Sequence, residues 1–141
     1  PQRHLTYRLY QLVPGDAERR WVWHEEVFLR EAERLIPADD TESLRELEAV
    51  LHHLRTLPTT PELFGMTHAD FGPQNFHFST VHGITAFDFG NCCRHWFTSD
   101  VAIAATLFRT QPNRTEVRDI LVAGYRTAFP IAEEMLREFG W

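Results

Sequence analysis

The sequence predicts an α+β fold that is mostly helical and carries one small β-hairpin. Apolar residues recur at helical spacings on both sides of the middle of the chain. The middle itself is rich in aromatic residues, Thr and Gly, and holds two short extended runs around a turn. With 141 residues, 43% of them hydrophobic, the chain is long enough to bury a core. We therefore expect a single domain over residues 1–141.

The first half of the chain predicts two helices after a short extended start. Residues 2–13 alternate weakly and end at PGD, a turn signal. Asp16 is expected to cap a helix that ends before Pro37, because its apolar residues lie mostly at helical spacings. A second helix is expected from about Thr41 until Pro58, with a capping-box pattern in TESLRE and leucines at three- and four-residue steps.

The second half predicts the hairpin and then three helices. Residues 75–79 and 84–87 form the extended runs, and STVHG reads as the turn between them. Helical periodicity returns at Ser99, an N-cap candidate, and resumes after the breaker QPN in a helix that carries Tyr125. IAEEMLREF, residues 131–139, is expected to form the last helix.

Composition argues against several classes of function. A net charge of -6 disfavours non-specific nucleic-acid binding, so no nucleic-acid partner is expected. No apolar run approaches the roughly 20 residues of a membrane helix, and the start lacks the layout of a signal peptide, so no membrane association is expected. The two cysteines are adjacent, which suits neither a mutual disulfide nor a zinc site, and indicates a reducing, cytoplasmic location.

Three oxygen-bearing side chains lie on the hairpin and on the loop before it. Asp70 and Asn75 are separated by FGPQ, in which Gly72 and Pro73 favour a turn. Asp88 follows the second extended run, and a hairpin brings its two outer ends together. We therefore expect the three side chains to converge. Hard cations such as Mg²⁺ take such ligands together with substrate phosphates, and the metal lets an acidic protein bind a phosphate ligand.

The spacing of these residues is that of phosphoryl-transfer enzymes. MTHADFGPQNFHF contains the pattern H-x-D-x-x-x-x-N, and D-F-G follows the hairpin at residues 88–90, as in the kinase catalytic loop and its metal aspartate. Two linked motifs in this order are more specific than either alone. LFGMTHADFGPQNFHF together with ITAFDFGNCCRHWFTSDVAIA resembles the aminoglycoside phosphotransferase and choline kinase-like family, in its uncharacterised bacterial phosphotransferase branch.

The resemblance implies a protein-kinase-like fold and an ATP-dependent, Mg²⁺-requiring phosphotransferase that acts on a hydroxyl of a small molecule. It implies that Asp70 is the catalytic base and that Asn75 and Asp88 are the magnesium ligands. His68 would support the loop, and Asp100 would be a structural aspartate just after the metal site.

The chain departs from the family at several points. The family often has Gly where Ala69 stands, and many relatives carry a further acidic residue where this chain has Gly90 and Asn91. All 14 basic residues are Arg, so the chain has no lysine, and it contains no G-x-G-x-x-G run. The resemblance therefore implies a carboxyl-terminal kinase lobe whose amino-terminal nucleotide lobe is missing from this sequence. We expect the chain alone to transfer little phosphate.

Two alternatives remain open. The first is a non-catalytic kinase-like binding module that acts through a partner, which the missing lysine and glycine loop favour. The second is a metal-dependent hydrolase that uses histidines. Alternation places His77 on the same face as Asn75, but His82 lies at the turn tip, far from Asp88. Aminoglycosides, choline, homoserine and protein hydroxyls all remain possible acceptors, and both ATP and GTP remain possible donors. A lone lobe would also expose an apolar face through which it could self-associate.

Overall fold

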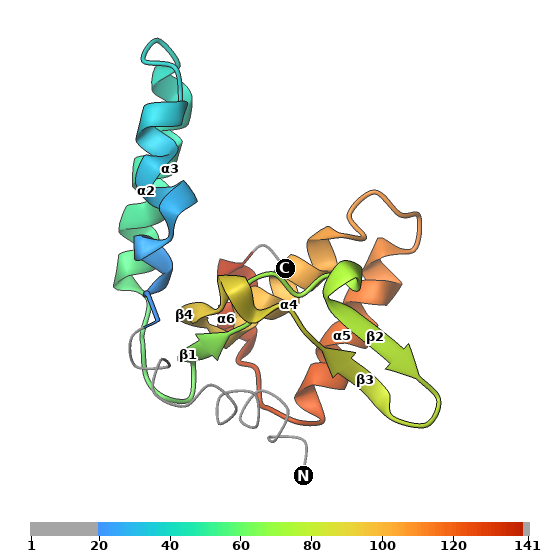
Figure 1. Cartoon of the computed structure of the whole chain (residues 1–141). Helices are drawn as coiled ribbons and strands as arrows, with labels where there is room; N and C mark the ends of the chain where they lie inside the picture. Colours follow the sequence, from blue (N-terminus) through green and yellow to red (C-terminus); the bar gives the residue numbers. More distant parts are fainter. Residues whose placement is uncertain (1–19, 140–141) are drawn as a thin grey trace.

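The computed structural model describes residues 20–139. The predicted segments at residues 2–13 and around Asp16 lie outside this range. Helices and strands alternate irregularly along the chain (Figure 1). The elements are the 3₁₀ turns η2 (Trp23–Glu25), η3 (Pro73–Asn75) and η4 (Phe89–Asn91), the helices α2 (Val27–Leu35), α3 (Thr41–Thr56), α4 (Phe97–Thr106), α5 (Arg114–Arg126) and α6 (Glu133–Glu138), and the strands β1 (Phe64–Thr67), β2 (Phe76–Ser79), β3 (Gly83–Ala86) and β4 (Cys93–Trp96).

The second predicted helix is confirmed, but its cap differs from the expected one. Helix α3 begins at Thr41 and ends before Pro58, as its leucine spacing indicated. Its N-cap is Asp40, whose Oδ1 accepts a hydrogen bond from the backbone N–H of Ser43 at 3.1 Å. That hydrogen bond lowers the pKa of the Asp40 carboxyl group. In Figure 1, α2 and α3 project together from the rest of the described chain.

The prediction of the first helix is wrong for residues 20–26, which the structure shows outside any α-helix. Val22 forms a parallel bridge with Arg94, η2 follows, and α2 begins only at Val27. The backbone N–H of Arg94 donates to the carbonyl of Trp21 at 3.0 Å. Residues 20–22 thus occupy an edge of β4 that would otherwise present unpaired polar groups, and tertiary pairing overrides the local helical pattern.

The predicted hairpin is confirmed to within one residue. Strands β2 and β3 pair antiparallel, with Phe76 opposite Ala86 and Ser79 opposite Gly83. Gly83 has a φ of 70°, a left-handed conformation that glycine adopts without steric cost. The hairpin therefore places residue 75 and residue 87 at the same end of one ribbon, as expected.

A second ribbon was not predicted. Strands β1 and β4 pair antiparallel, with Phe64 opposite Trp96 and Thr67 opposite Cys93. The hydroxyl of Thr67 also donates to the carbonyl oxygen of Cys93 at 3.0 Å. This ribbon joins the chain just before residue 68 to the chain just after residue 92. The predicted site residues 68, 70, 75 and 88 therefore belong to the segment that connects its two strands in sequence, whereas Asp100 lies on α4.

The later helices pack against this ribbon. The N-cap of helix α4 is Trp96 and not Ser99, which lies buried inside the helix, so the predicted cap is wrong by three residues. The ring of Phe97, the first residue of α4, lies over Gly65 so closely that a Cβ at Gly65 would stand 2.6 Å from its Cζ atom. The start of α4 is tied to β1, because the backbone N–H of Phe97 donates to the carbonyl of Leu63 at 3.0 Å. Helix α6 is shorter than predicted and begins at Glu133.

Two clusters of buried side chains form the core. The first lies around the β1–β4 ribbon and comprises Trp23, Phe64, Trp96 and Met135, with leucines of α2 and α3 packed against it. The second lies between the last three helices and comprises Val101, Val122 and Leu136. Since Met135 and Leu136 are neighbours on α6, this helix joins the two clusters. Among residues 20–139, no helix is long and apolar enough to cross a membrane.

Candidate active site

The catalytic-loop candidate begins where β1 ends, and Asp100 holds its first turn. The Asp100 carboxylate accepts two hydrogen bonds of 2.8 Å, at Oδ2 from the backbone N–H of His68 and at Oδ1 from that of Ala69. Burial raises the pKa of Asp100, although these two backbone hydrogen bonds oppose the shift. Asp100 therefore joins the first turn of α4 to the loop.

The loop needs this support because Ala69 has a φ of 62°. A left-handed conformation costs an L-residue other than glycine about 1–2 kcal/mol. Glycine at this position would avoid that cost. The two hydrogen bonds to Asp100 hold the strained backbone in place.

His68 joins the loop to the end of the hairpin. Its side chain is buried, and its Nε2 lies 2.9 Å from the carbonyl oxygen of Phe87. Because a carbonyl only accepts, Nε2 carries the proton in this contact. The ring also packs against Phe71 and Phe89, with ring centroids 5.6 and 4.6 Å apart. Its Nδ1 is buried and has no hydrogen-bond partner among the described residues.

Asp70 and Asn75 are in direct contact, as the turn between them predicted. The carboxamide Nδ2 of Asn75 donates to the backbone carbonyl of Asp70 at 2.7 Å and to its Oδ2 at 3.0 Å. The turn closes through backbone hydrogen bonds of 2.9 Å from Gly72 N–H to the Asp70 carbonyl and from Asn75 N–H to the Gly72 carbonyl. Asn75 is buried, and its Nδ2 makes both of these side-chain hydrogen bonds.

Asp88 lies on the turn that follows the hairpin. The backbone N–H of Phe87, the residue before Asp88, donates to the carbonyl of Asn75 at 3.0 Å. Asp88 is exposed and left-handed, with a φ of 58°. Its Oδ1 accepts a weak hydrogen bond from the Gly90 N–H at 3.4 Å. The structure thus brings the backbone of Asp88 beside the Asp70–Asn75 pair, and the roles of the three residues stay a prediction.

Two further residues reach this site, and sequence reasoning missed both. Asn91 Nδ2 donates to Oδ2 of Asp70 at 3.4 Å. Arg20 Nη1 donates to the carbonyl of Gly90 at 3.1 Å, across 70 positions of sequence. The signal for Asn91 was its place directly after the D-F-G motif. No local pattern marks Arg20, because its position depends on the pairing of residues 20–22 with β4.

The donor set suits magnesium better than zinc. A carboxamide oxygen and carboxylate oxygens are the ligands that Mg²⁺ prefers, and the oxygens of Asn75 and Asp88 are of this kind. Within residues 20–139, no group of three or more His, Cys, Asp or Glu side chains is arranged to hold a metal ion. The thiols of Cys92 and Cys93 are buried, and burial raises the pKa of Cys93 to about 11.

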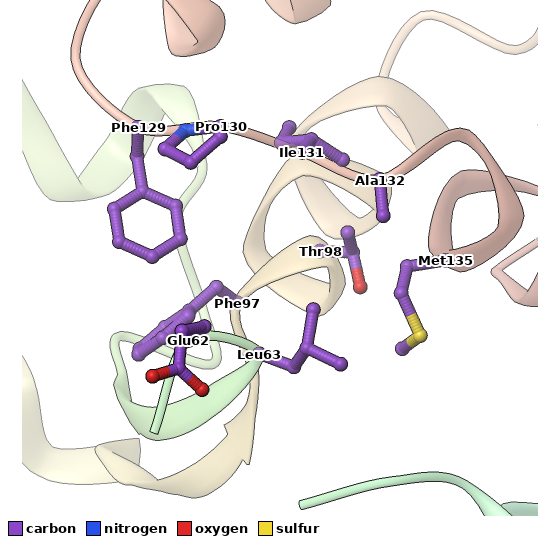
Figure 2. Close-up of a pocket in the computed structure, with 9 residues that line it drawn as sticks. All are labelled: Glu62, Leu63, Phe97, Thr98, Phe129, Pro130, Ile131, Ala132 and Met135. Atoms are coloured by element: carbon purple, nitrogen blue, oxygen red, sulfur yellow. The ribbon is translucent and has the colours of Figure 1, made fainter. Parts of the chain in front are cut away.

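A pocket elsewhere in the structure contains none of the predicted site residues. It lies between the segment before β1, the start of α4 and the connection from α5 to α6 (Figure 2). The rings of Phe97 and Phe129 line it, 5.1 Å apart between centroids, together with Leu63 and Met135. The Thr98 hydroxyl also belongs to the lining and has no hydrogen-bond partner among the described residues.

Comparisons with known proteins connect this geometry to kinases. Residues 8–139 match a family described as the phosphotransferase enzyme family. The amicoumacin kinase of Bacillus subtilis (strain 168) is 33% identical over 101 residues, which are 71% of this chain and 29% of that protein.

Two solved structures share the fold. The amicoumacin kinase hAmiN, in complex with AMP-PNP, Ca²⁺ and Ami, has a TM-score of 0.75 and 28% identity, and the match covers 85% of this chain and 39% of that one. The microcompartment-associated aminopropanol kinase has a TM-score of 0.57 and 25% identity, with 92% of this chain and 40% of that one covered. These matches confirm the predicted fold class. The chain spans well under half the length of each of these relatives.

Proposed function

Because this chain belongs to the phosphotransferase enzyme family, we propose that it is the catalytic-loop part of a kinase that phosphorylates a hydroxyl of a small molecule. The proposal extends to ATP as the donor and to Mg²⁺ as the metal. It is supported by the names of the relatives, which are small-molecule kinases, and by the nucleotide analogue and divalent cation in the complex of one of them.

One observation carries the proposal. Asp70 and Asn75 share a hydrogen bond of 3.0 Å, and Asn75 is joined through its carbonyl to the residue before Asp88. A base and two metal ligands on adjacent turns are the parts that phosphoryl transfer needs, because the protein contributes mainly positioning and charge neutralisation.

In the proposed reaction, Asp70 orients the acceptor hydroxyl and takes its proton. The hydroxyl oxygen forms a bond to the terminal phosphorus of ATP while the bond from that phosphorus to the β-phosphate oxygen breaks. The products are ADP and a phosphate monoester of the acceptor. The Asn75 Oδ1 and the Asp88 carboxylate would hold the magnesium ion, which when bound neutralises charge on the nucleotide phosphates.

The rest of the nucleotide site is proposed to lie in the remainder of the protein. The solved relatives extend well beyond the part that this chain matches. Family members use a phosphate-covering loop and a lysine, and this chain has neither the glycine run nor any lysine. Activity should therefore be measured on the intact protein.

The test is a phosphorylation screen of the intact protein with ATP and Mg²⁺ against hydroxyl-bearing metabolites. Amicoumacin and aminopropanol, the compounds in the names of the relatives, are the first acceptors to try. We expect ADP release and an acceptor product heavier by one phosphoryl group. Chelation of the metal should stop both. Acceptor binding with no transfer under any of these conditions would favour the binding-module alternative.

The substitution Asp70→Asn tests the role of the base. General-base catalysis contributes about 10²- to 10⁴-fold, so we expect turnover to fall by about that factor while the fold survives. Asp39→Asn is the matched control, because Asp39 is exposed and lies in the turn before α3. Near-normal turnover of Asp70→Asn would show that Asp70 is not the base.

A further inference from the structure

The proposed function assigns no role to the side chain of Asn91. Asn91 ends η4, the turn that also carries Asp88, and it is exposed. Its Nδ2 donates to Oδ2 of Asp70 at 3.4 Å. The two residues are 21 positions apart, so this contact is a product of the fold and not of local sequence.

Two carboxamides meet on one oxygen of the candidate base. Asn75 Nδ2 lies 3.0 Å and Asn91 Nδ2 lies 3.4 Å from Oδ2 of Asp70. Both of these hydrogen bonds go to Oδ2 and neither goes to Oδ1. A carboxylate turns readily about its Cβ–Cγ bond because this torsion is broad. Donors from two directions restrict that rotation and leave Oδ1 as the oxygen that can face an acceptor hydroxyl.

The two donors come from different parts of the site. Asn75 lies on the same loop as Asp70 and moves with it, whereas Asn91 lies on the metal turn. The backbone of that turn is itself held by hydrogen bonds from the Cys92 N–H to the Phe89 carbonyl, at 3.2 Å, and from Arg20 to the Gly90 carbonyl, at 3.1 Å. Asn91 therefore presents its amide from a fixed position and joins the base to the turn that carries Asp88.

We infer that Asn91 is a positioning residue for Asp70, which fixes the plane of its carboxylate relative to the metal turn. The inference rests on the proposed function and adds a residue to its machinery. If the plane of the Asp70 carboxylate is not fixed, Asp70 orients the acceptor hydroxyl for a smaller fraction of the time, while both substrates still bind. The defect should therefore appear in kcat and not in KM.

The test compares Asn91→Ala and Asn91→Asp in the intact protein. The hydrogen bond from Asn91 goes to a carboxylate but is long, at 3.4 Å, so we assign it no more than an ordinary hydrogen bond contributes, about 0.5–1.5 kcal/mol. We therefore expect kcat to fall by about two- to tenfold in Asn91→Ala, with KM for ATP and for the acceptor within about twofold. Asn91→Asp keeps the shape of the side chain but lacks the donor and adds a negative charge beside Asp70. It should lose at least as much, whereas a residue that only supported the turn would tolerate this substitution.

Asn113→Ala is the matched control. Asn113 is exposed and precedes α5 without a side-chain capping hydrogen bond, so its loss should leave kcat unchanged. If wild type is active and Asp70→Asn is not, but Asn91→Ala and Asn91→Asp both keep the wild-type kcat, the proposed function stands and the inference about Asn91 is wrong.

A second measurement does not depend on activity. The side-chain amide resonances of Asn91 and Asn113 can be followed by NMR in the intact protein, with each assigned from its own alanine variant. Asp70→Asn should shift the Asn91 signal and leave the Asn113 signal in place. An Asn91 signal that does not respond overturns the inference whether or not the enzyme is active. A response in a protein that transfers no phosphate supports the contact and refutes only the kinase role.

Discussion

Acidification should weaken the fold through His95, which lies on β4 opposite Gly65. Its ring packs among aromatic side chains, 6.1 Å from the ring of Trp23 and 5.8 Å from that of Phe139 between centroids. Burial lowers the pKa of His95 from 6.5 to about 4. Its Nδ1 accepts a hydrogen bond from the backbone N–H of Trp96 at 2.8 Å, which requires an unprotonated nitrogen.

The direction of the pH effect follows from the linkage between proton binding and folding. Between pH 6.5 and about 4, the unfolded chain binds a proton at His95 that the folded chain does not bind. The stability that His95 contributes is therefore fully present above pH 6.5 and is lost as the pH falls towards about 4, the pKa of His95 in the folded protein. The difference between the unfolded pKa of 6.5 and the folded pKa of about 4 corresponds to at most about 3 kcal/mol of unfolding free energy, of which about 2 kcal/mol should be lost by pH 5.

The assay is urea unfolding of the intact protein at pH 7, 6 and 5, followed by intrinsic fluorescence, since Trp23 and Trp96 lie in the core beside His95. The variant His95→Asn carries a carboxamide whose oxygen can accept the Trp96 hydrogen bond but which does not titrate. We expect the variant to be less stable at pH 7, because it packs less surface, and to lose about 2 kcal/mol less than wild type between pH 7 and pH 5. Equal losses in the two proteins would refute the reasoning.

Three further predictions concern the loop and the ribbon. Asp100→Ala removes the acceptor of two loop amides, so we expect a loss of about 3 kcal/mol in unfolding free energy and a lower kcat, with Asp100→Asn intermediate because it keeps one acceptor oxygen. Ala69→Gly should raise the unfolding free energy by up to about 1 kcal/mol, because it removes the strain of a φ of 62°; lower stability would show that this strain is absent. Gly65→Ala should lower the unfolding free energy by about 1–3 kcal/mol, because the new Cβ clashes with Phe97. Gly124→Ala is the control: its Cβ meets nothing within 4 Å, so it should stabilise α5 by about 0.5–1 kcal/mol. Equal effects of the two variants in thermal melts would contradict the packing at Gly65.

Local patterns predicted the parts of the fold that local physics decides. The leucine spacing of α3 and the STVHG turn of the hairpin each depend on neighbours in sequence, and the structure confirms both elements. The family resemblance read from the two linked motifs is also confirmed, by the match over residues 8–139. Two linked motifs at fixed spacing identified the family because together they are more specific than either alone.

Elements that depend on distant partners were missed or placed wrongly. Strands β1 and β4 are only four residues each, and Gly65 and His95 weaken any strand pattern in them. Val22 would extend a helix by its local sequence, but it pairs with Arg94 instead. In the same way, the contact between Asp70 and Asn75 follows from the turn between them, whereas the approach of Asn91 depends on the whole fold.

The register of the β1–β4 ribbon leads us to expect that residues 68–92 can be exchanged as one segment. Its two junctions, Thr67 and Cys93, lie opposite each other in register and are joined by a hydrogen bond, so a segment of the same length from another member of the family should fit between them, provided that it keeps a small apolar residue at the buried position 92. The graft would still need an aspartate at position 100, because the incoming loop amides find their acceptor on α4, outside the grafted segment.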